Sequence, residues 1–232
     1  MADYDLYYWP VPFRGQFIRA ILAYAEKSWD EHDSGEIGQL MSLEPEDQPI
    51  AFMGPPVLTD VKSGFTISQM PAIAMYLGDT LGLVENEPEV RAMTAKIVND
   101  ANDVIDEITL DGGRQMWTKD KWEEFIPRLE KWMAIFEATA IHHGLKAESG
   151  HLLGTPKAGV ADIVTSTLWS TMADRFPSIQ TMLEATAPSI AALTRRMQAI
   201  PSLNALRERS FEQYGQAYCG GEIEKSLRRV VD

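Results

Sequence analysis

The stretch from Gly54 to Leu77 most constrains what this 232-residue chain can fold into. Apolar runs at 57–61 and 65–67 flank Lys62-Ser63-Gly64, which is the pattern of two strands joined by a tight turn. A helical run from Gln69 to about Leu77 follows directly. The order predicts an antiparallel β-hairpin that leads into a helix.

The N-terminal residues predict a strand and then a helix. Residues Tyr4 to Trp9 mix aromatics with leucine and end at Pro10, which is typical of a short buried strand. From Gln16 to Lys27, apolar residues recur at helical spacing, which predicts an amphipathic helix over one face of the sheet. Residues 35–54 are weakly patterned, and no element can be assigned there.

The remainder of the chain reads as helical. The segment from Gly78 to Glu89 contains two glycines, a proline and several acids, which suits a linker between domains. Apolar residues from Trp122 to Ala140 then fall on one helical face, where Pro127 either kinks the helix or lies near its beginning. Two further helices are predicted at 161–172 and 188–198.

The order of the elements predicts two domains. An α/β domain is expected in residues 1–80, followed by an all-helical domain in residues 88–232. The chain is 45% hydrophobic and 24% charged, without an apolar run long enough to span a bilayer, so a soluble protein with no membrane partner is expected. The acidic start lacks the features of a secretory signal, which favours a cytoplasmic location.

Charge and metal-ligating residues exclude some classes of function. The net charge of −13 argues against a nucleic-acid partner, because phosphate groups demand a basic face. The stretch from Ser28 to Val61 contains eight acids and no Lys or Arg. It is either a solvated acidic surface or a rim that repels anions or attracts an ammonium group. No metal site is expected, because adjacent His142 and His143 diverge on a helix and no carboxylate or cysteine completes a set with them.

Several segments resemble, in the right order, the cytosolic glutathione transferases of the tyrosine type (mu-, pi- and sigma-like). The resemblance rests on the first strand and loop (Tyr8-Trp9-Pro10-Val11, then Arg14-Gly15, with two extra residues at Pro12-Phe13), the cis-proline turn (Pro56-Val57-Leu58), the helix start (Gln69-Met70-Pro71-Ala72-Ile73) and the folding motif (Leu153-Gly154 to Asp162-Ile163). It spans nearly the whole chain. It implies a thioredoxin-like domain followed by a helical bundle domain.

The resemblance implies that Tyr8 donates a hydrogen bond to the sulfur of glutathione. A free thiol has a pKa of about 8.5, and stabilising the thiolate by about 2.7 kcal/mol would lower that pKa by about two units. A hydrogen bond to a charged group supplies roughly 1.5–3 kcal/mol, which is most of this amount. Tyr7 is an alternative, although adjacent strand residues point to opposite faces. A third interpretation is that Tyr8 is only an aromatic residue of a buried strand.

The expected glutathione anchors are Pro55, Pro56, Gln69, Met70 and Arg14. The resemblance implies that Pro56 is cis and that the residue before it pairs with the glutathione backbone, although Pro55 has no N–H to donate. Met70 replaces the family's serine, so it offers a backbone N–H to the γ-glutamyl carboxylate but no hydroxyl, a loss of about 1.5–3 kcal/mol. Alternatively, Met70 packs in the core of a fold that no longer binds glutathione.

Two further groups of residues follow from the resemblance. The glycyl carboxylate of glutathione lacks a Lys or Arg partner in residues 28–61, where only Trp29 and His32 are remote candidates. Arg14 and Gln16 are the alternatives elsewhere in the chain. The resemblance also points to walls of an apolar pocket for an electrophile, unless these residues are core fillers: Trp9, Phe13, Arg114, Met116 and Trp117. Asp162, three residues after Gly159, is expected to hold a helix start.

The function predicted from the sequence is that of a glutathione transferase active in detoxification. Glutathione would serve as co-substrate and a small apolar electrophile as second substrate, and the resemblance implies a homodimer. Two alternatives stay open. One is a non-catalytic binding or structural protein on the same scaffold. The other is a glutathione-dependent lyase or isomerase.

Overall fold

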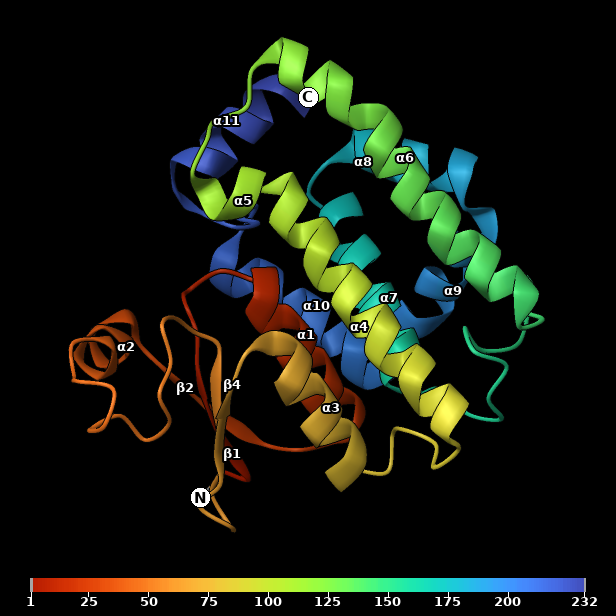
Figure 1. Cartoon of the computed structure of the whole chain (residues 1–232). Coiled ribbons are helices and arrows are strands. Elements are labelled where there is room, and N and C mark those ends of the chain that lie inside the picture. The colour runs from red at the N-terminus through yellow and green to blue at the C-terminus, as the bar shows by residue number, and fades with distance from the viewer. Residues whose placement is uncertain (1, 232) are drawn as a thin grey trace.

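The structure of the chain is a computed structural model, which describes residues 2–231 (Figure 1). The four strands are β1 (Tyr4–Tyr7), β2 (Trp29–His32), β3 (Val57–Asp60) and β4 (Thr66–Ser68). The helices among them are α1 (Phe13–Tyr24), α2 (Ser34–Met41) and α3 (Met70–Thr80). The helices that follow are α4 (Pro88–Ile108), α5 (Leu110–Gly113), α6 (Lys119–His142), α7 (Val160–Ala173), α8 (Pro177–Thr186), α9 (Pro188–Gln198), α10 (Pro201–Tyr214) and α11 (Gly221–Val231). The predicted fold class is therefore confirmed.

The strands form one mixed sheet in the order β2-β1-β3-β4. β1 pairs in parallel with β2 and antiparallel with β3, and β3 pairs antiparallel with β4. Burial alternates along β1, where Tyr4 and Leu6 are buried while Asp5 and Tyr7 are half-buried. Helices α1 and α3 cover the buried face, and α2 lies on the other side of the strands (Figure 1).

The hairpin at the centre of the sequence prediction is confirmed, since β3 and β4 pair as predicted. The first strand is shorter than expected and ends at Tyr7 rather than Trp9. The register pairs Tyr7 with Val57, so Tyr8 would face Pro56 in a longer ladder. Pro56 has no N–H to offer there, which is a physical reason for the strand to end.

The stretch after α1 holds two elements that the sequence pattern did not predict. β2 consists of Trp29-Asp30-Glu31-His32 and has a strand neighbour only in β1. Because its residues are mostly charged or polar, it shows no apolar run. α2 follows, and its start carries a capping box in which Asp33 accepts the N–H groups of Gly35 and Glu36.

Pro127 lies well inside α6, so this helix continues through the proline rather than beginning there. The predicted helix over 188–198 coincides with α9, and the one over 161–172 lies within α7. Residues 81–87, between α3 and α4, belong to no helix or strand. Among the helices described, none combines the length and apolarity that crossing a bilayer requires.

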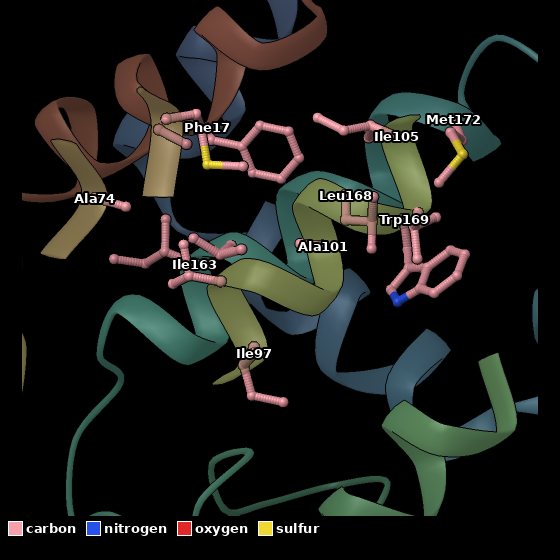
Figure 2. Packing of buried hydrophobic residues seen from close by; sticks show 14 of the residues in the cluster. Phe17, Ala74, Ile97, Ala101, Ile105, Ile163, Leu168, Trp169 and Met172 are labelled. Carbon is pink, nitrogen blue, oxygen red and sulfur yellow. The ribbon is translucent and has the colours of Figure 1, made fainter. Parts of the chain in front are cut away.

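One hydrophobic core runs through both parts of the chain. Figure 2 shows Phe17 of α1 and Ala74 of α3 beside side chains of α4 and α7, among them Ile163 and Leu168. Trp169 of α7 is fully buried and packs edge-on against Phe136 of α6, with ring centroids 5.6 Å apart. The sheet, with α1 and α3, is thus fixed on the helical part by side-chain packing.

Candidate active site at the end of β1

The sheet register brings three predicted site residues to one edge. Tyr7 pairs with Val57, and Val57 pairs with Ser68. The next residues at that edge are Tyr8 after β1, Pro56 before β3 and Gln69 after β4. The Pro55–Pro56 peptide bond is cis, and Gln69 has φ 74°. Positive φ is rare outside glycine and clusters at functional sites.

The hydroxyl of Tyr8 accepts a hydrogen bond from the backbone N–H of Arg14 at 3.1 Å. Tyr8 is only 4% exposed. Burial raises the pKa of its phenol to about 12, against the opposing effect of Arg14. The hydroxyl therefore stays protonated at neutral pH. No acceptor for its hydrogen is found within residues 2–231, so the hydroxyl can donate to a ligand.

The ring of Tyr8 packs against α1, close to Gly15 and to the buried guanidinium of Arg19. A Cβ placed on Gly15 would lie 2.3 Å from Cδ1 of Tyr8, so α1 approaches the ring as closely as glycine permits. The guanidinium carbon of Arg19 lies 5.8 Å from the ring centroid. Arg19 also donates to the carbonyls of Val11 and Pro12 at 3.1 and 3.3 Å. The loop after β1 is thereby fixed to α1.

Arg19 is in turn held by Glu31 of β2. Nε and Nη2 of Arg19 donate to the two carboxylate oxygens of Glu31 at 2.6 and 2.8 Å, a bidentate pair. The indole N–H of Trp29 donates to the same carboxylate at 2.9 Å. Although burial acts in the opposite direction, these hydrogen bonds lower the pKa of Glu31. The pair connects α1, β2 and the ring of Tyr8.

Tyr7 lies on the opposite face of the sheet. Its ring stacks on that of His32, with centroids 4.0 Å apart. His32 lies 3.0 Å from Glu36 and 3.2 Å from Asp5, and although burial lowers the pKa of its imidazole, these carboxylates raise it overall. Tyr7 therefore does not share the position of Tyr8, as strand alternation predicts.

The family model of the glutathione S-transferase C-terminal domain matches residues 93–230, more than half of the chain. The chain belongs to the glutathione S-transferase family. No curated protein sequence matched it.

Solved structures agree with this assignment. The structure described as NaGST-2 is 25% identical, covers 90% of this chain and 97% of its own, and has a TM-score of 0.70. A Pi-class glutathione S-transferase of Onchocerca volvulus is 17% identical, with coverages of 94% and 98% and a TM-score of 0.74. Na-GST-3 of the hookworm Necator americanus, described as monomeric, is 22% identical, with coverages of 89% and 96% and a TM-score of 0.70.

In this chain, the side chain of Arg14 is directed to the helical part. Its Nε and Nη2 donate to Asn102 at 3.3 Å and Asp106 at 3.2 Å, both on α4. Met70 is 1% exposed and packs in the core. The side chain of Met70 therefore lies in the core, as one of the two interpretations of the sequence predicted. Only its backbone N–H at the start of α3 is left for a ligand.

The predicted electrophile pocket is not assembled as expected. Trp117 is a core residue, because its indole N–H donates to the carbonyl of Ile108 at 2.9 Å and its ring packs against Trp122 and Phe125. Phe13 is also buried and packs edge-on against Tyr218. Trp9 is half-buried, whereas Arg114 and Met116 are exposed. None of the hollows found within residues 2–231 is lined by these five residues together.

Asp162 lies at the start of α7 and is buried. Its carboxylate accepts the backbone N–H groups of Leu152 at 2.7 Å and Gly159 at 3.0 Å. Burial raises the pKa of this carboxyl against the effect of both bonds. The side chain therefore joins the preceding loop to the helix.

A hollow of about 240 Å³ adjoins Tyr8 at the carboxyl ends of β1 and β2. Its lining consists of Tyr8, Pro10, Glu31, His32, Asp33, Ser34 and Tyr214. Tyr8 was the predicted catalytic residue, Pro10 belonged to the motif that carried the resemblance, and His32 was a remote candidate for the glycyl carboxylate, whereas the other lining residues were not assigned to the site. The acidic stretch and His32 were visible as features, but β2 was not recognised, so nothing indicated that they meet Tyr8.

The segment Ala217–Gly220 lies over the loop that follows β1. The carbonyl of Tyr218 accepts the N–H of Phe13 at 3.2 Å. One carboxylate oxygen of Glu224, on α11, accepts the backbone N–H groups of Tyr218, Cys219 and Gly220 at 2.9, 3.0 and 2.6 Å. Burial raises the pKa of the Cys219 thiol to about 12. Within residues 2–231, no group of three or more His, Cys, Asp or Glu side chains could hold a metal ion.

Proposed function

We propose that this protein is a glutathione transferase that conjugates the glutathione thiolate to a small apolar electrophile. The observation that carries the proposal is the hydroxyl of Tyr8, which accepts the N–H of Arg14 and has its own hydrogen free to donate. A thiolate placed at this hydroxyl would gain about 1.5–3 kcal/mol. That gain lowers a thiol pKa by about one to two units, which brings it close to neutral pH.

The remaining glutathione contacts are proposed along the same edge of the sheet. The carbonyl of Pro55, before the cis bond to Pro56, would accept the N–H of the cysteinyl residue. The γ-glutamyl carboxylate would lie at the N-terminus of α3, where Gln69 and the backbone of Met70 begin the helix. Arg14 would act through its backbone N–H on Tyr8, since its guanidinium is engaged by α4.

Glutathione titration with readout of thiolate absorbance against pH tests the proposal. The bound thiol should ionise about one to two pH units below free glutathione. In Tyr8→Phe this shift should disappear, and turnover with a general aromatic electrophile at neutral pH should fall about ten- to hundredfold. Tyr7→Phe is the matched control and should keep both. Absence of glutathione binding at millimolar concentration would contradict the proposal.

A non-catalytic protein on the same scaffold is the second candidate. It is favoured by the buried side chain of Met70, which supplies no hydroxyl, and by Pro55, which supplies no N–H. In that case glutathione would bind without a Tyr8-dependent shift of the thiol pKa, or not at all. The same titration therefore separates the two functions.

A homodimer and a cytoplasmic location complete the proposal. Met53 is 89% exposed and Phe65 46% exposed, which suits apolar contacts with a second copy. The single cysteine of the chain cannot form an internal disulfide, as is usual for proteins of a reducing compartment. A solution mass near 26.0 kDa would contradict the dimer.

A further inference from the structure

The backbone N–H that Arg14 donates to the Tyr8 hydroxyl follows an unusual piece of backbone. The residue before it, Phe13, has φ 28°, a positive value that residues other than glycine rarely adopt. Such a conformation persists only where surrounding contacts hold it. Because the peptide group between Phe13 and Arg14 carries this N–H, the contacts that hold Phe13 also determine where the N–H points.

Contacts that hold Phe13 come from the C-terminal end of the chain. The carbonyl of Tyr218 accepts the N–H of Phe13 at 3.2 Å, and the two rings pack edge-on with centroids 5.4 Å apart. Two residues further on, a Cβ placed on Gly220 would lie 3.3 Å from Cγ1 of Val11. The segment Ala217–Gly220 therefore holds the loop after β1 at Phe13 and lies close to it at Val11.

The part of this loop before Phe13 is held separately, by α1. Arg19 donates to the carbonyls of Val11 and Pro12, and the N–H of Gln16 donates to the carbonyl of Pro12 at 2.8 Å. These bonds hold carbonyl groups, whereas the N–H of Phe13 is bound by the C-terminal segment. Release of that segment would therefore free Phe13 while Val11 and Pro12 stay in place.

A buried carboxylate holds the C-terminal segment in turn. Glu224 is 7% exposed, and one of its oxygens accepts the N–H groups of Tyr218, Cys219 and Gly220. Its other oxygen accepts Nε and Nη2 of Arg228 at 2.9 and 2.8 Å. Although burial acts in the opposite direction, these hydrogen bonds lower the pKa of the Glu224 carboxyl. Glu224 therefore stays charged over the pH range in which a bound thiol ionises.

We propose that Glu224 is a positioning residue for Tyr8. Through the segment that it holds, Glu224 keeps the N–H of Arg14 on the hydroxyl of Tyr8 and thereby strengthens the bond from that hydroxyl to a glutathione thiolate. The inference rests on the proposed function, since it assumes a thiolate at Tyr8. A donor stabilises a charge best when it is held in place beforehand, and an accepted N–H polarises the O–H group.

The sign of the expected effect separates positioning from simple electrostatics. Glu224 is an anion, so removal of its charge would by itself favour a nearby thiolate and lower the thiol pKa. Release of the segment has the opposite effect. It lets the N–H of Arg14 leave the Tyr8 hydroxyl, which weakens the stabilisation of the thiolate and raises the thiol pKa.

Thiolate absorbance of bound glutathione, measured against pH, tests the inference. In Glu224→Ala the thiol pKa should rise by about 0.5–1 unit, which is less than the loss of about one to two units expected for Tyr8→Phe. Glu224→Gln keeps an oxygen for the three N–H groups and should give a smaller rise. Glu222→Ala removes an exposed acid of the same helix and should leave the pKa unchanged. An unchanged or lowered pKa in Glu224→Ala would overturn the inference.

S-methylglutathione, which has no thiol proton, distinguishes positioning from general damage to the site. Its affinity should be the same in Glu224→Ala as in the wild type. The affinity for glutathione at about pH 9 should fall about three- to tenfold, because a rise of the bound thiol pKa by about 0.5–1 unit is an equal loss of affinity for the thiolate. Equal losses for both ligands would mean that Glu224 only maintains the fold, and the inference would be wrong.

Tyr8→Phe separates this inference from the proposed function. If the thiol pKa depends on Tyr8 but not on Glu224, the proposed function stands and the inference fails. If the thiol pKa does not depend on Tyr8, both are wrong. In the double variant, Glu224→Ala should raise the pKa no further than Tyr8→Phe alone, because both changes act on the same hydroxyl. An additive rise would show a route that bypasses Tyr8 and would contradict the inference.

Discussion

Gly15 shows how a single residue fixes the position of the proposed catalytic hydroxyl. An added Cβ would lie 2.3 Å from the ring of Tyr8 and 2.9 Å from Nη1 of Arg19. Arg19 cannot move freely, because it is paired with Glu31 and also binds the carbonyls of Val11 and Pro12. The hydroxyl of Tyr8 is bonded to the backbone N–H of Arg14. The absence of a side chain at this position is therefore part of the site's geometry.

Gly15→Ala should destabilise the protein by about 1–3 kcal/mol, because the added methyl group overpacks a buried site. It should also raise the pKa of the thiol of bound glutathione, because the ring of Tyr8 must shift and its hydroxyl would no longer be placed to donate to the sulfur. Chemical denaturation measures the first effect and thiolate absorbance the second. In Gly38→Ala, the matched control, the new methyl meets nothing, and a helical alanine should stabilise by up to about 1 kcal/mol. A Gly15→Ala variant as stable as the wild type would contradict the close approach.

Glu31 adds a pH dependence of stability. The pKa of its carboxyl is lowered in the folded protein, so its pair with Arg19 stabilises the fold above the unfolded pKa of about 4.3, and this contribution is lost as the pH falls through the folded value. In Glu31→Gln, the free energy of unfolding should therefore decrease less steeply than in the wild type as the pH falls below about 4.5. Urea denaturation at a series of pH values measures this. An unchanged acid limb in the variant would mean that Glu31 is not linked to folding.

At the scale of elements, apolar patterning and chain geometry predicted much of the fold. The hairpin β3–β4 follows from two apolar runs around a turn, and the helices α1, α3, α6, α7 and α9 follow from apolar spacing. β2 was missed because an acidic strand at the sheet edge has no apolar run. α2 was missed although Asp33 and Glu36 have the spacing of a capping box. The hollow beside Tyr8 could not be predicted without β2, and α10, which supplies Tyr214, is remote in sequence.

Glu224 holds the segment Ala217–Gly220 over the loop that follows β1. Its carboxylate accepts three consecutive backbone N–H groups, and Arg228 on the same helix pairs with it. Glu224→Ala should release this segment, at about 1.5–3 kcal/mol for the loss of bonds to a charged group. Hydrogen exchange at residues 218–220 measures the release. Glu222→Ala, which removes an exposed pair with Lys225, should leave the exchange unchanged. Equal exchange in both variants would contradict this role.

At the scale of the whole molecule, the sheet and the helical part share one core. Leu168 of α7 is 1% exposed and belongs to the same cluster as Phe17 of α1 and Ala74 of α3 (Figure 2). A boundary between 80 and 88 was predicted from the linker composition alone. The packing across that boundary was not predictable, because it depends on which helix faces meet.

Leu168→Ala should lower the free energy of unfolding by about 2–5 kcal/mol, because a buried cavity remains. The loss should appear in one transition for the whole chain. Denaturation followed by far-UV circular dichroism and by tryptophan fluorescence tests whether both probes shift together. Leu43→Ala, at an exposed position, is the control and should change the midpoint little. Two separated transitions would show that the parts unfold independently.

The position of Cys219 makes its thiol a reporter of the opening of the segment Ala217–Gly220. It is the only cysteine, and its thiol, with a pKa of about 12, is almost entirely in the unreactive protonated form while the segment is closed. Once Ala217–Gly220 lifts, the pKa should return toward about 8.5 and the thiolate fraction should rise by orders of magnitude. The rate at which a reagent alkylates the Cys219 thiol of the native protein therefore measures how often this segment opens, and no cysteine has to be introduced for the measurement.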